Sequence, residues 1–338
     1  MKALIAAGGR STRLRPITHS INKHLIPLAG RPMLEYVIEK LVEADIRDII
    51  INVNPGETGI MHAAFGDGGR WDAAISYVEQ QGGAKGIAHA VANAEPYLRG
   101  GPFVFFLGDN IMTGSIRKMR ERYEAEGFDC MVALSRVEDP SRFGVPEFNP
   151  DGSLKRAIEK PASPPSPFAI TGIYFFNERY FDAFKTISPS PRGEYEITDM
   201  ITWYITHGRV GHEEITGWWK DTGTPDALLE GNTFLLSQTR IGEGTVIGED
   251  VTIRDPVVIG TGCHIEQAVV GPHVSIGDNA RVRGAAIQRS IVMDGTTLEG
   301  GFSVDRSIIG RNARITSRNS VGSGPSKLIL GDNAVVEL

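Results

Sequence analysis

Aliphatic side chains recur every six residues in the C-terminal part of this chain, and no other feature restricts its fold as strongly. Isoleucine occupies five successive positions of the pattern: Ile241, Ile247, Ile253, Ile259 and Ile265. After a slip in phase near Pro272, the pattern continues through a further set of aliphatic residues: Ile276, Val282, Val292, Leu298 and Val304. Hexads of this kind are typical of a parallel β-helix, in which each coil buries its aliphatic side chains against the next coil.

The start of the repeat marks a boundary between two predicted domains. The composition changes at residues 235–240, so we predict one domain over residues 1–236 and a β-helix domain over residues 237–338. A total of 338 residues is enough for two domains. A short apolar run at residues 328–330 is expected to form a last strand that caps the stack of coils.

The first domain has the pattern of an α/β fold. Apolar runs predict strands at residues 3–7, 48–54, 75–79, 103–107, 130–137 and 210–216. Helices are expected over residues 33–42 and 86–98, and a further helix is expected to open within residues 192–199. Strands that alternate with helices imply a mostly parallel, Rossmann-like sheet, and ligands of such sheets bind at the carboxyl ends of the strands.

A glycine pair after the first strand is a candidate phosphate loop. No carboxylate precedes Glu35 in a chain of net charge -6, although this stretch holds six cations: Lys2, Arg10, Arg13, Arg15, Lys23 and Arg31. Backbone N–H groups of Gly8 and Gly9 would form an anion-binding turn, with Arg13 as a planar fork and Lys23 as a point charge. The spacing fits neither a dinucleotide fingerprint nor a P-loop. An ordinary strand-to-helix connection with solvated arginines is the alternative.

Asp109 directly follows the most apolar strand and is a candidate magnesium ligand. The ion needs only one or two protein carboxylates where nucleotide phosphates complete its octahedron. The alternative is an aspartate that caps the next helix. Asp221, before Thr224 and Pro225, is open to the same two interpretations.

Composition and cysteine count exclude several classes of protein. A pI near 5.8 argues against a general nucleic-acid or membrane-surface binder, which needs a basic surplus over a whole face. Cys130 and Cys263 are far apart and have no metal-ligand spacing, so neither disulfides nor structural zinc are expected. No apolar run is long enough to cross a bilayer, and the cytoplasm is the expected compartment.

Three motifs near the N-terminus carry a resemblance: Gly8-Gly9-x-x-Thr12-Arg13-Leu14-x-Pro16, Lys23-x-Leu25-Ile26-Pro27 and Arg31-Pro32-Met33. They resemble the signature of the sugar-1-phosphate nucleotidyltransferases, and within that family most of all the long-form thymidylyltransferases. Ser11 stands where the family usually has a glycine. A serine costs about 1–2 kcal/mol if the position needs a left-handed conformation.

The resemblance implies a role for each matching residue. Arg13, Lys23 and Lys160 would be catalytic, and Asp109 and Asp221 would hold Mg²⁺. Nucleotide contacts would come from eight positions: Gly8, Gly9, Ser11, Thr12, Arg13, Gln81, Gly86 and Asp109. The sugar 1-phosphate would contact Gly144, Glu159, Lys160, Ile170 and Arg192. Resemblance to hexapeptide-repeat proteins further implies that the β-helix is left-handed and that the chain forms a homo-oligomer.

The implied reaction joins a sugar 1-phosphate to a pyrimidine nucleoside triphosphate, with dTTP and glucose 1-phosphate favoured. UTP is an alternative nucleotide, because the loop around Gln81 does not decide between the two pyrimidines. A regulatory paralogue that binds nucleotide sugar but turns over poorly is a second alternative, for which Ser11 is the hint. Acyl transfer by His264 or His273 in the repeat domain is a third, and no acyl-donor site supports it.

Overall fold

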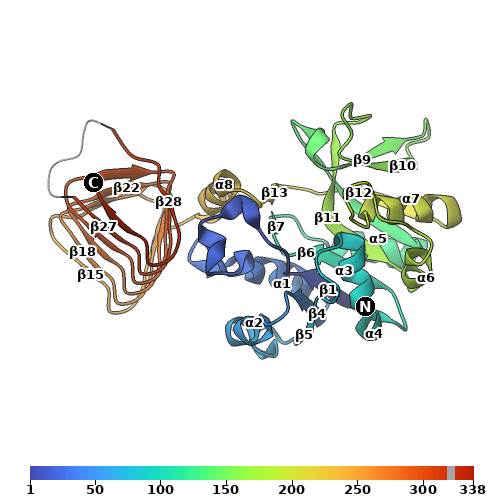
Figure 1. Ribbon diagram of the computed structural model, residues 1–338, viewed down its shortest axis with the longest axis horizontal. Helices are drawn as coiled ribbons and strands as arrows, with labels where there is room; N and C mark the ends of the chain where they lie inside the picture. Colours follow the sequence, from blue (N-terminus) through green and yellow to red (C-terminus); the bar gives the residue numbers. More distant parts are fainter. Residues whose placement is uncertain (318–323) are drawn as a thin grey trace. The chain divides into compact units, whose positions relative to one another are not determined.

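The computed structural model describes residues 1–317 and 324–338, and the described chain divides into two compact units (Figure 1). The first unit consists of Met1–Gly9 and Leu34–Trp219. The second consists of Arg10–Met33 and Lys220–Leu338, so the segment after the glycine pair belongs with the C-terminal repeats. The units are groups of residues in mutual contact, and the sequence boundary after residue 236 stays a prediction.

The parallel half of the first unit's sheet is the Rossmann-like part of the fold. Its four strands pair in parallel: β1 (Lys2–Ala6), β4 (Asp48–Val53), β5 (Ala74–Glu79) and β6 (Phe103–Leu107). Strand β1 lies between β4 and β6, so the loop after β1 starts at the carboxyl edge of this half. The prediction of a parallel α/β sheet is confirmed here.

The other half of the sheet is largely antiparallel. It is built from β8 (Cys130–Arg136), β9 (Gly144–Phe148), β10 (Leu154–Glu159), β11 (Phe168–Phe176) and β12 (Val210–Glu214). Strand β11 pairs antiparallel with β6, β8 and β9, whereas β12 runs parallel to β8. A small ribbon joins β7 (Asn110–Met112) to β13 (Trp219–Asp221).

Strand β6 is central and buried, as its apolar sequence predicts. It lies between β1 and β11, and Phe103 packs against Phe176, Tyr180 and Phe181. These rings belong to a large buried cluster that fills the space between the sheet and its helices. The core therefore fixes the ends of β1 and β6, and Gly8 and Asp109 each follow two residues after one of these ends.

Seven α-helices accompany this sheet in the described residues: α1 (Met33–Glu43), α2 (Thr58–Phe65), α3 (Ile87–Asn93), α4 (Glu95–Leu98), α5 (Arg117–Glu126), α6 (Tyr180–Phe184) and α7 (Ile197–His207). The single helix expected over residues 86–98 is divided between α3 and α4 at Ala94. Pro96 explains the break, because proline has no N–H with which to continue the helical hydrogen bonds. Helices α2, α5 and α6 were not expected. In the described residues no helix has the length and hydropathy needed to span a membrane.

The N-terminal segment of the second unit is built from short elements. Three 3₁₀ turns precede a small hairpin: η1 (Thr12–Leu14), η2 (Ile17–His19), η3 (Lys23–Leu25), β2 (Pro27–Leu28) and β3 (Arg31–Pro32). Helix α8 (Pro225–Leu235) begins after Thr224, whose Oγ1 accepts the N–H of Ala227 at 3.3 Å. Asn232 of α8 is buried and accepts the Ala29 N–H at 2.8 Å and the Ser275 hydroxyl at 2.9 Å. One amide therefore joins the N-terminal segment, α8 and the repeats.

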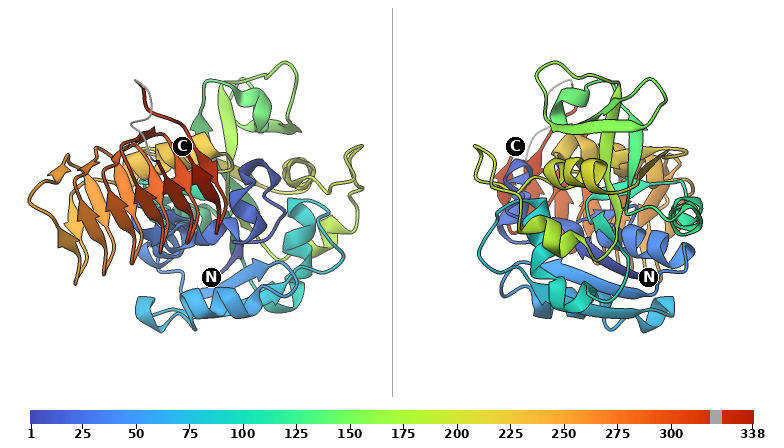
Figure 2. Two further views of the ribbon diagram at one scale, coloured as in Figure 1. Left: turned by 60° about the vertical axis from the view of Figure 1, so that its left-hand side comes forward. Right: turned by 90° about the vertical axis from the view of Figure 1, so that its right-hand side faces the viewer.

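The repeats form three parallel sheets, consistent with a left-handed β-helix, and Figure 2 shows their coils stacked in register. One sheet contains β14 (Arg240–Ile241), β17 (Val257–Ile259), β20 (Val274–Ile276), β23 (Ile291–Val292), β26 (Ile308–Ile309) and β28 (Ile329–Leu330). The second contains β15 (Val246–Ile247), β18 (His264–Glu266), β21 (Arg281–Arg283), β24 (Thr297–Glu299), β27 (Arg314–Thr316) and β29 (Val335–Glu337). The third contains β16 (Thr252–Ile253), β19 (Val269–Val270), β22 (Ala286–Gln288) and β25 (Ser303–Asp305).

Register explains the hexads. Ile241 pairs with Ile259, and Ile247 pairs with Ile265, so equivalent positions of successive coils meet. From Ile259 and Ile265 onward the aliphatic side chains form one continuous buried cluster along the stack, whereas Ile241 of the first coil is exposed. The expected last strand is present as β28, and β29 follows it in the same final coil.

Candidate active site

The loop after β1 is held by the end of the neighbouring strand. The Gly9 N–H donates to Asn54 Oδ1 at 2.7 Å, and Asn54 Nδ2 donates to the Gly9 carbonyl at 3.3 Å. Asn54 directly follows β4, so the parallel pairing of β1 and β4 brings it beside the glycines. Sequence reasoning gave Asn54 no role. The predicted anion contact of the Gly9 N–H requires that this group exchange Asn54 for the ligand.

Ser11 has the left-handed backbone that would make a glycine the easier residue. Its φ is 45° and its ψ is 39°. The Ser11 carbonyl accepts two hydrogen bonds, from the Leu14 N–H at 3.0 Å and from Thr18 Oγ1 at 2.9 Å. The condition under which this serine costs about 1–2 kcal/mol is therefore met. Thr12 and Arg13 follow in η1 with exposed side chains, whereas Leu14 is buried and anchors the turn.

Arg13 and Asp221 both lie against Gly223 in the second unit. A Cβ atom on Gly223 would be 2.8 Å from Arg13 Nη2 and 3.0 Å from Asp221 Oδ1. Asp221 Oδ1 also accepts the Gly223 N–H at 2.9 Å. The cap of α8 is Thr224, so the interpretation of Asp221 as a helix cap is wrong. Gly223 therefore lies between two candidate site residues, and sequence reasoning gave it no role.

Asp109 is buried at the end of β6, and its surroundings are fixed by Asn110. Asp109 Oδ1 accepts Asn110 Nδ2 at 3.0 Å, and Asn110 Oδ1 accepts Trp219 Nε1 at 2.9 Å and the Gly172 N–H at 3.3 Å. Strand β7 follows Asp109, so the alternative in which it caps a helix is wrong. Trp219 packs edge-on against Phe143 and serves to hold Asn110.

The donor chemistry of Asp109 and Asp221 fits a magnesium ion. Both offer carboxylate oxygens, which are the donors that this hard cation prefers. Within the described residues no group of three or more His, Cys, Asp or Glu side chains could hold a metal alone. A nucleotide-dependent magnesium site does not need such a group, because phosphate oxygens and water supply the other ligands.

The antiparallel half of the sheet gathers three of the residues expected at the sugar. Gly144 opposes Glu159 in the pairing of β9 with β10 and opposes Ile170 in the pairing with β11. A Cβ atom on Gly144 would be 3.6 Å from Glu159 Oε2, 3.8 Å from Ile170 Cβ and 2.8 Å from Thr198 Cγ2. Spacing along the chain could not show this convergence, because it depends on which strands pair.

Two cations flank the carboxylate of this group. Lys160 Nζ lies 3.1 Å from Glu159 Oε1, and Arg192 Nη2 lies 3.3 Å from the same oxygen. Arg192 also pairs with the buried carboxylate of Glu196 at 2.9 Å, at the start of α7. The five residues expected to bind the sugar 1-phosphate therefore lie together in the first unit. A carboxylate beside two exposed cations suits a ligand with both hydroxyl and phosphate groups.

The first turn of α7 adds two polar residues beside this group. Thr198 is buried next to Gly144, and its Oγ1 has no hydrogen-bond partner among residues 1–317 and 324–338. Partial burial, together with the charges of Glu196 and Glu159, raises the pKa of the Asp199 carboxyl. Both residues fall in the stretch 192–199, where the sequence predicts the start of a helix, and sequence reasoning gave neither a role.

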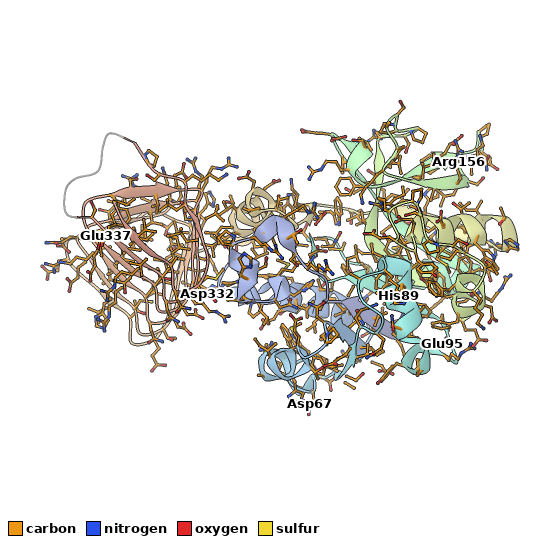
Figure 3. All side chains as sticks on the ribbon, in the orientation of Figure 1. Asp67, His89, Glu95, Arg156, Asp332 and Glu337 are labelled. Atoms are coloured by element: carbon orange, nitrogen blue, oxygen red, sulfur yellow. The ribbon has the colours of Figure 1, made fainter. Side chains whose placement is uncertain are left out.

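Gly86, which the family resemblance places at the nucleotide, is packed against protein backbone. A Cβ atom on Gly86 would lie 2.6 Å from the Tyr195 carbonyl oxygen, so protein backbone already occupies that side of Gly86. Gln81 is exposed, and its carbonyl accepts Asn93 Nδ2 at 3.4 Å. His89, labelled in Figure 3, makes a 3.0 Å hydrogen bond with Gln80, and burial and then Lys85 lower the pKa of His89. Helix α3 thus supports the loop that carries Gln81.

Comparison with known proteins gives matches over both parts of the chain. Residues 2–238 match the family described as "Nucleotidyl transferase", and residues 265–337 match the family described as "GMPPB C-terminal domain". A glucose-1-phosphate thymidylyltransferase of Streptomyces griseus is 36% identical over 357 residues, which cover 100% of this chain and 99% of the relative. The low-salt glycan biosynthesis nucleotidyltransferase Agl11 of Haloferax volcanii is 34% identical over 359 residues, and the match covers 100% of both chains.

A solved structure matches the first part. It is described as a "Putative Glucose-1-Phosphate Thymidylyltransferase" from Bacillus anthracis in complex with a sucrose. Its chain is 36% identical to this one with a TM-score of 0.67, and the match covers 71% of this chain and 97% of that chain.

Proposed function

The chain belongs to the nucleotidyl transferase family, and from this premise we propose that it transfers a thymidylyl group from dTTP to glucose 1-phosphate. The products would be dTDP-glucose and pyrophosphate. Nucleotidyl transfer to a sugar 1-phosphate is the activity of the enzyme, and the choice of thymine and of glucose is the proposal. Full-length similarity to a protein of that name supports both choices.

The observation that carries the proposal is the convergence of Gly144, Glu159 and Ile170 beside Lys160 and Arg192. Glu159 presents a carboxylate that can accept hydrogen bonds from hexose hydroxyls. Lys160 and Arg192 present exposed cations to the phosphate of the same ligand. Glu159 and Ile170 can approach each other at this point because Gly144 has no side chain to separate them.

The proposed reaction is an in-line displacement at the α-phosphorus of the nucleotide. A phosphate oxygen of glucose 1-phosphate forms a bond to that phosphorus, and the bond from the phosphorus to the oxygen that bridges the α- and β-phosphates breaks, so that this oxygen leaves with pyrophosphate. The attacking oxygen is already anionic at neutral pH, so no protein nucleophile is needed. The site has to align two anions and neutralise their charge.

The residues of the chain divide this work. Lys160 and Arg192 hold the attacking phosphate, and Lys23 places its positive charge beside the α-phosphate. Arg13, together with the N–H groups of Gly8, Ser11 and Thr12, stabilises the charge that develops on pyrophosphate. Gln81 presents its amide to the pyrimidine.

Asp109 and Asp221 would hold Mg²⁺ in this proposal. The ion would neutralise triphosphate charge and polarise the phosphorus–oxygen bond that breaks. Its carboxylate ligands are fixed beforehand, Asp109 by Asn110 and Asp221 by the N–H of Gly223.

Pyrophosphate release tests the proposal directly. The full chain is assayed with Mg²⁺ and glucose 1-phosphate against dTTP, UTP, CTP, ATP and GTP in parallel, and again without Mg²⁺. We expect the highest kcat/KM with dTTP and loss of turnover without the metal. Preference for UTP would replace the thymidylyl group of the proposal by a uridylyl group. No release with any nucleotide, together with dTDP-glucose binding by calorimetry, would replace catalysis by a binding role.

A further inference from the structure

The turn of the last coil lies against the N-terminal segment within the second unit. Asp332, labelled in Figure 3, accepts two hydrogen bonds. The Ser20 hydroxyl donates to its Oδ2 at 2.8 Å, and the Arg311 N–H donates to its Oδ1 at 2.7 Å. Beside it, a Cβ atom on Gly331 would lie 3.0 Å from the carbonyl oxygen of Pro16. The final coil therefore contacts the 3₁₀ segment on both sides of η2.

One of the two hydrogen bonds of Asp332 recurs in other turns of the β-helix, and the other does not. Equivalent turns of earlier coils contain Asp278 and Asp294, whose Oδ1 atoms accept the N–H of Thr261 at 2.7 Å and of Asp278 at 3.1 Å. Asp332 Oδ1 makes the same bond between coils, to Arg311. Its second oxygen adds the bond to Ser20, which stands outside the repeat.

A further hydrogen bond links the segment that contains Ser20 to the phosphate loop. Ser20 directly follows η2, and Thr18 within η2 donates its hydroxyl to the Ser11 carbonyl at 2.9 Å. Ser11 is the left-handed residue that precedes Arg13 by two positions. A series of contacts thus runs from Asp332 through Ser20 and Thr18 to the loop.

We propose that Thr18 and Asp332 are positioning residues that hold Ser11 left-handed and so orient Arg13 toward the nucleotide phosphates. The inference rests on the proposed function for the role of Arg13. A glycine would need no such support, because it has no Cβ atom to clash in this conformation. Because Ser11 replaces the family's usual glycine, its backbone needs a restraint, and Asp332 of the last coil supplies it through Ser20. The C-terminal domain therefore contributes to nucleotide binding without touching the nucleotide.

Hydrogen exchange and kinetics on the full chain test this together. The variants are Thr18→Val, Ser20→Ala and Asp332→Ala, with Thr18→Ser as the conservative variant that keeps the hydroxyl. Asp278→Ala is the matched control, because it removes the same bond between coils and leaves Ser20 untouched. Deuterium uptake is followed in peptides that cover residues 10–20, and KM is measured for dTTP and for glucose 1-phosphate.

We expect Thr18→Val, Ser20→Ala and Asp332→Ala to raise deuterium uptake in residues 10–20. The same variants should raise the KM for dTTP about three- to tenfold, the effect of one lost hydrogen bond, and leave the KM for glucose 1-phosphate unchanged. Thr18→Ser and Asp278→Ala should match the wild type in both measurements. Adding Ser11→Gly to Thr18→Val should restore the KM for dTTP to within about twofold, since glycine adopts the conformation unaided.

The opposite results would overturn the inference. Unchanged uptake in the three variants would show that Asp332 and Thr18 do not hold the loop. An equal KM effect from Asp278→Ala would show a general loss of the β-helix instead. No restoration by Ser11→Gly would show that the effect of Thr18→Val does not act through the conformation of Ser11. Failure of the proposed function is separate, because it appears as absent pyrophosphate release in the wild type, while the exchange result still decides whether the loop is held.

Discussion

The backbone of Ser11 has a conformation that glycine adopts without a steric penalty, and the loop tolerates the serine because its carbonyl is bound from two sides. The sequence predicts the penalty, but it does not show Thr18 as the compensating donor. Asn54 is a similar case, since its role depends on the pairing of β1 with β4. Roles that depend on one residue and its neighbours are thus predictable, whereas roles that depend on a distant partner are not.

Arg13 is the first residue whose loss we expect to affect turnover. Arg13→Ala should lower kcat by about 10²- to 10³-fold, because it removes a charged donor that acts on the leaving pyrophosphate. The fold should remain intact, since the side chain is exposed. Pyrophosphate release measures the effect, with Arg10→Ala as a control of equal charge in the same loop. An equal loss in the control would assign the effect to the net charge of the loop.

Gly144 is where the sugar group is most tightly packed. Gly144→Ala should raise the KM for glucose 1-phosphate by about tenfold, since the new Cβ atom would lie 2.8 Å from Thr198 Cγ2 and displace its neighbours. The KM for dTTP should change little. Gly101→Ala is the matched control, because a Cβ atom there meets nothing within 4 Å. An unchanged KM for the sugar phosphate would place the sugar elsewhere.

Asp199 gives stability a dependence on pH. Partial burial and the charges of Glu196 and Glu159 raise the pKa of its carboxyl above the unfolded value. The folded state therefore holds the proton to higher pH, so this contribution is present in acid and is lost as pH rises through the folded pKa. Asp199→Asn should unfold at a higher temperature than the wild type at pH 7, and this advantage should vanish below the unfolded pKa. Melting curves from pH 3 to pH 8 check it, and an advantage that grows in acid would contradict it.

Among the elements, those defined by local pattern were predictable. Apolar runs predicted β1, β4, β5 and β6, and the hexads predicted the coils, because each pattern lies within a few consecutive residues. The antiparallel pairing of β11 with β6, β8 and β9 was not predictable, since strand order depends on contacts between distant segments. The convergence of Gly144, Glu159 and Ile170 depends on that pairing, so resemblance to a family could suggest it and spacing could not.

Helix α8 offers a test at this scale. Thr224→Ala should lower the free energy of unfolding by about 1 kcal/mol, because it removes the side chain that accepts the Ala227 N–H at the start of the helix. Thr224→Ser keeps the acceptor and should be close to the wild type. Chemical denaturation of both variants measures the difference. Equal losses in the two would show that the methyl group, and not the hydroxyl, stabilises this end.

At the scale of the whole molecule, the two units defined by residue contacts do not coincide with the two domains predicted from the sequence. Residues 10–33 carry most of the family signature, yet they belong to the unit that holds the repeats. Ala29 packs with Leu236 and Val258, and Arg240 donates to the Ala29 carbonyl at 3.1 Å. Composition marks a change near residue 236, but it cannot show that an N-terminal segment packs on the C-terminal repeats.

A variant that ends at residue 236 should therefore be impaired as well as shorter. It loses the contacts of Ala29 with Val258 and of Asn232 with Ser275, and a fully buried aliphatic side chain alone contributes about 1.5–3 kcal/mol. We expect a lower melting temperature and a higher KM for dTTP than in the full chain. Calorimetry and pyrophosphate release measure both. Equal values would show that the first domain is independent of the repeats.

The bond between Ser20 and Asp332 joins residues 312 positions apart, and this separation sets an order of events during synthesis. At about 5–20 residues per second, the ribosome makes Asp332 roughly 15 to 60 seconds after Ser20. Most of the sheet can pair in that interval, but the segment that carries the signature must wait for its support. A nascent chain that stalls before the last coil would thus display the signature in full and still lack the restraint on its phosphate loop.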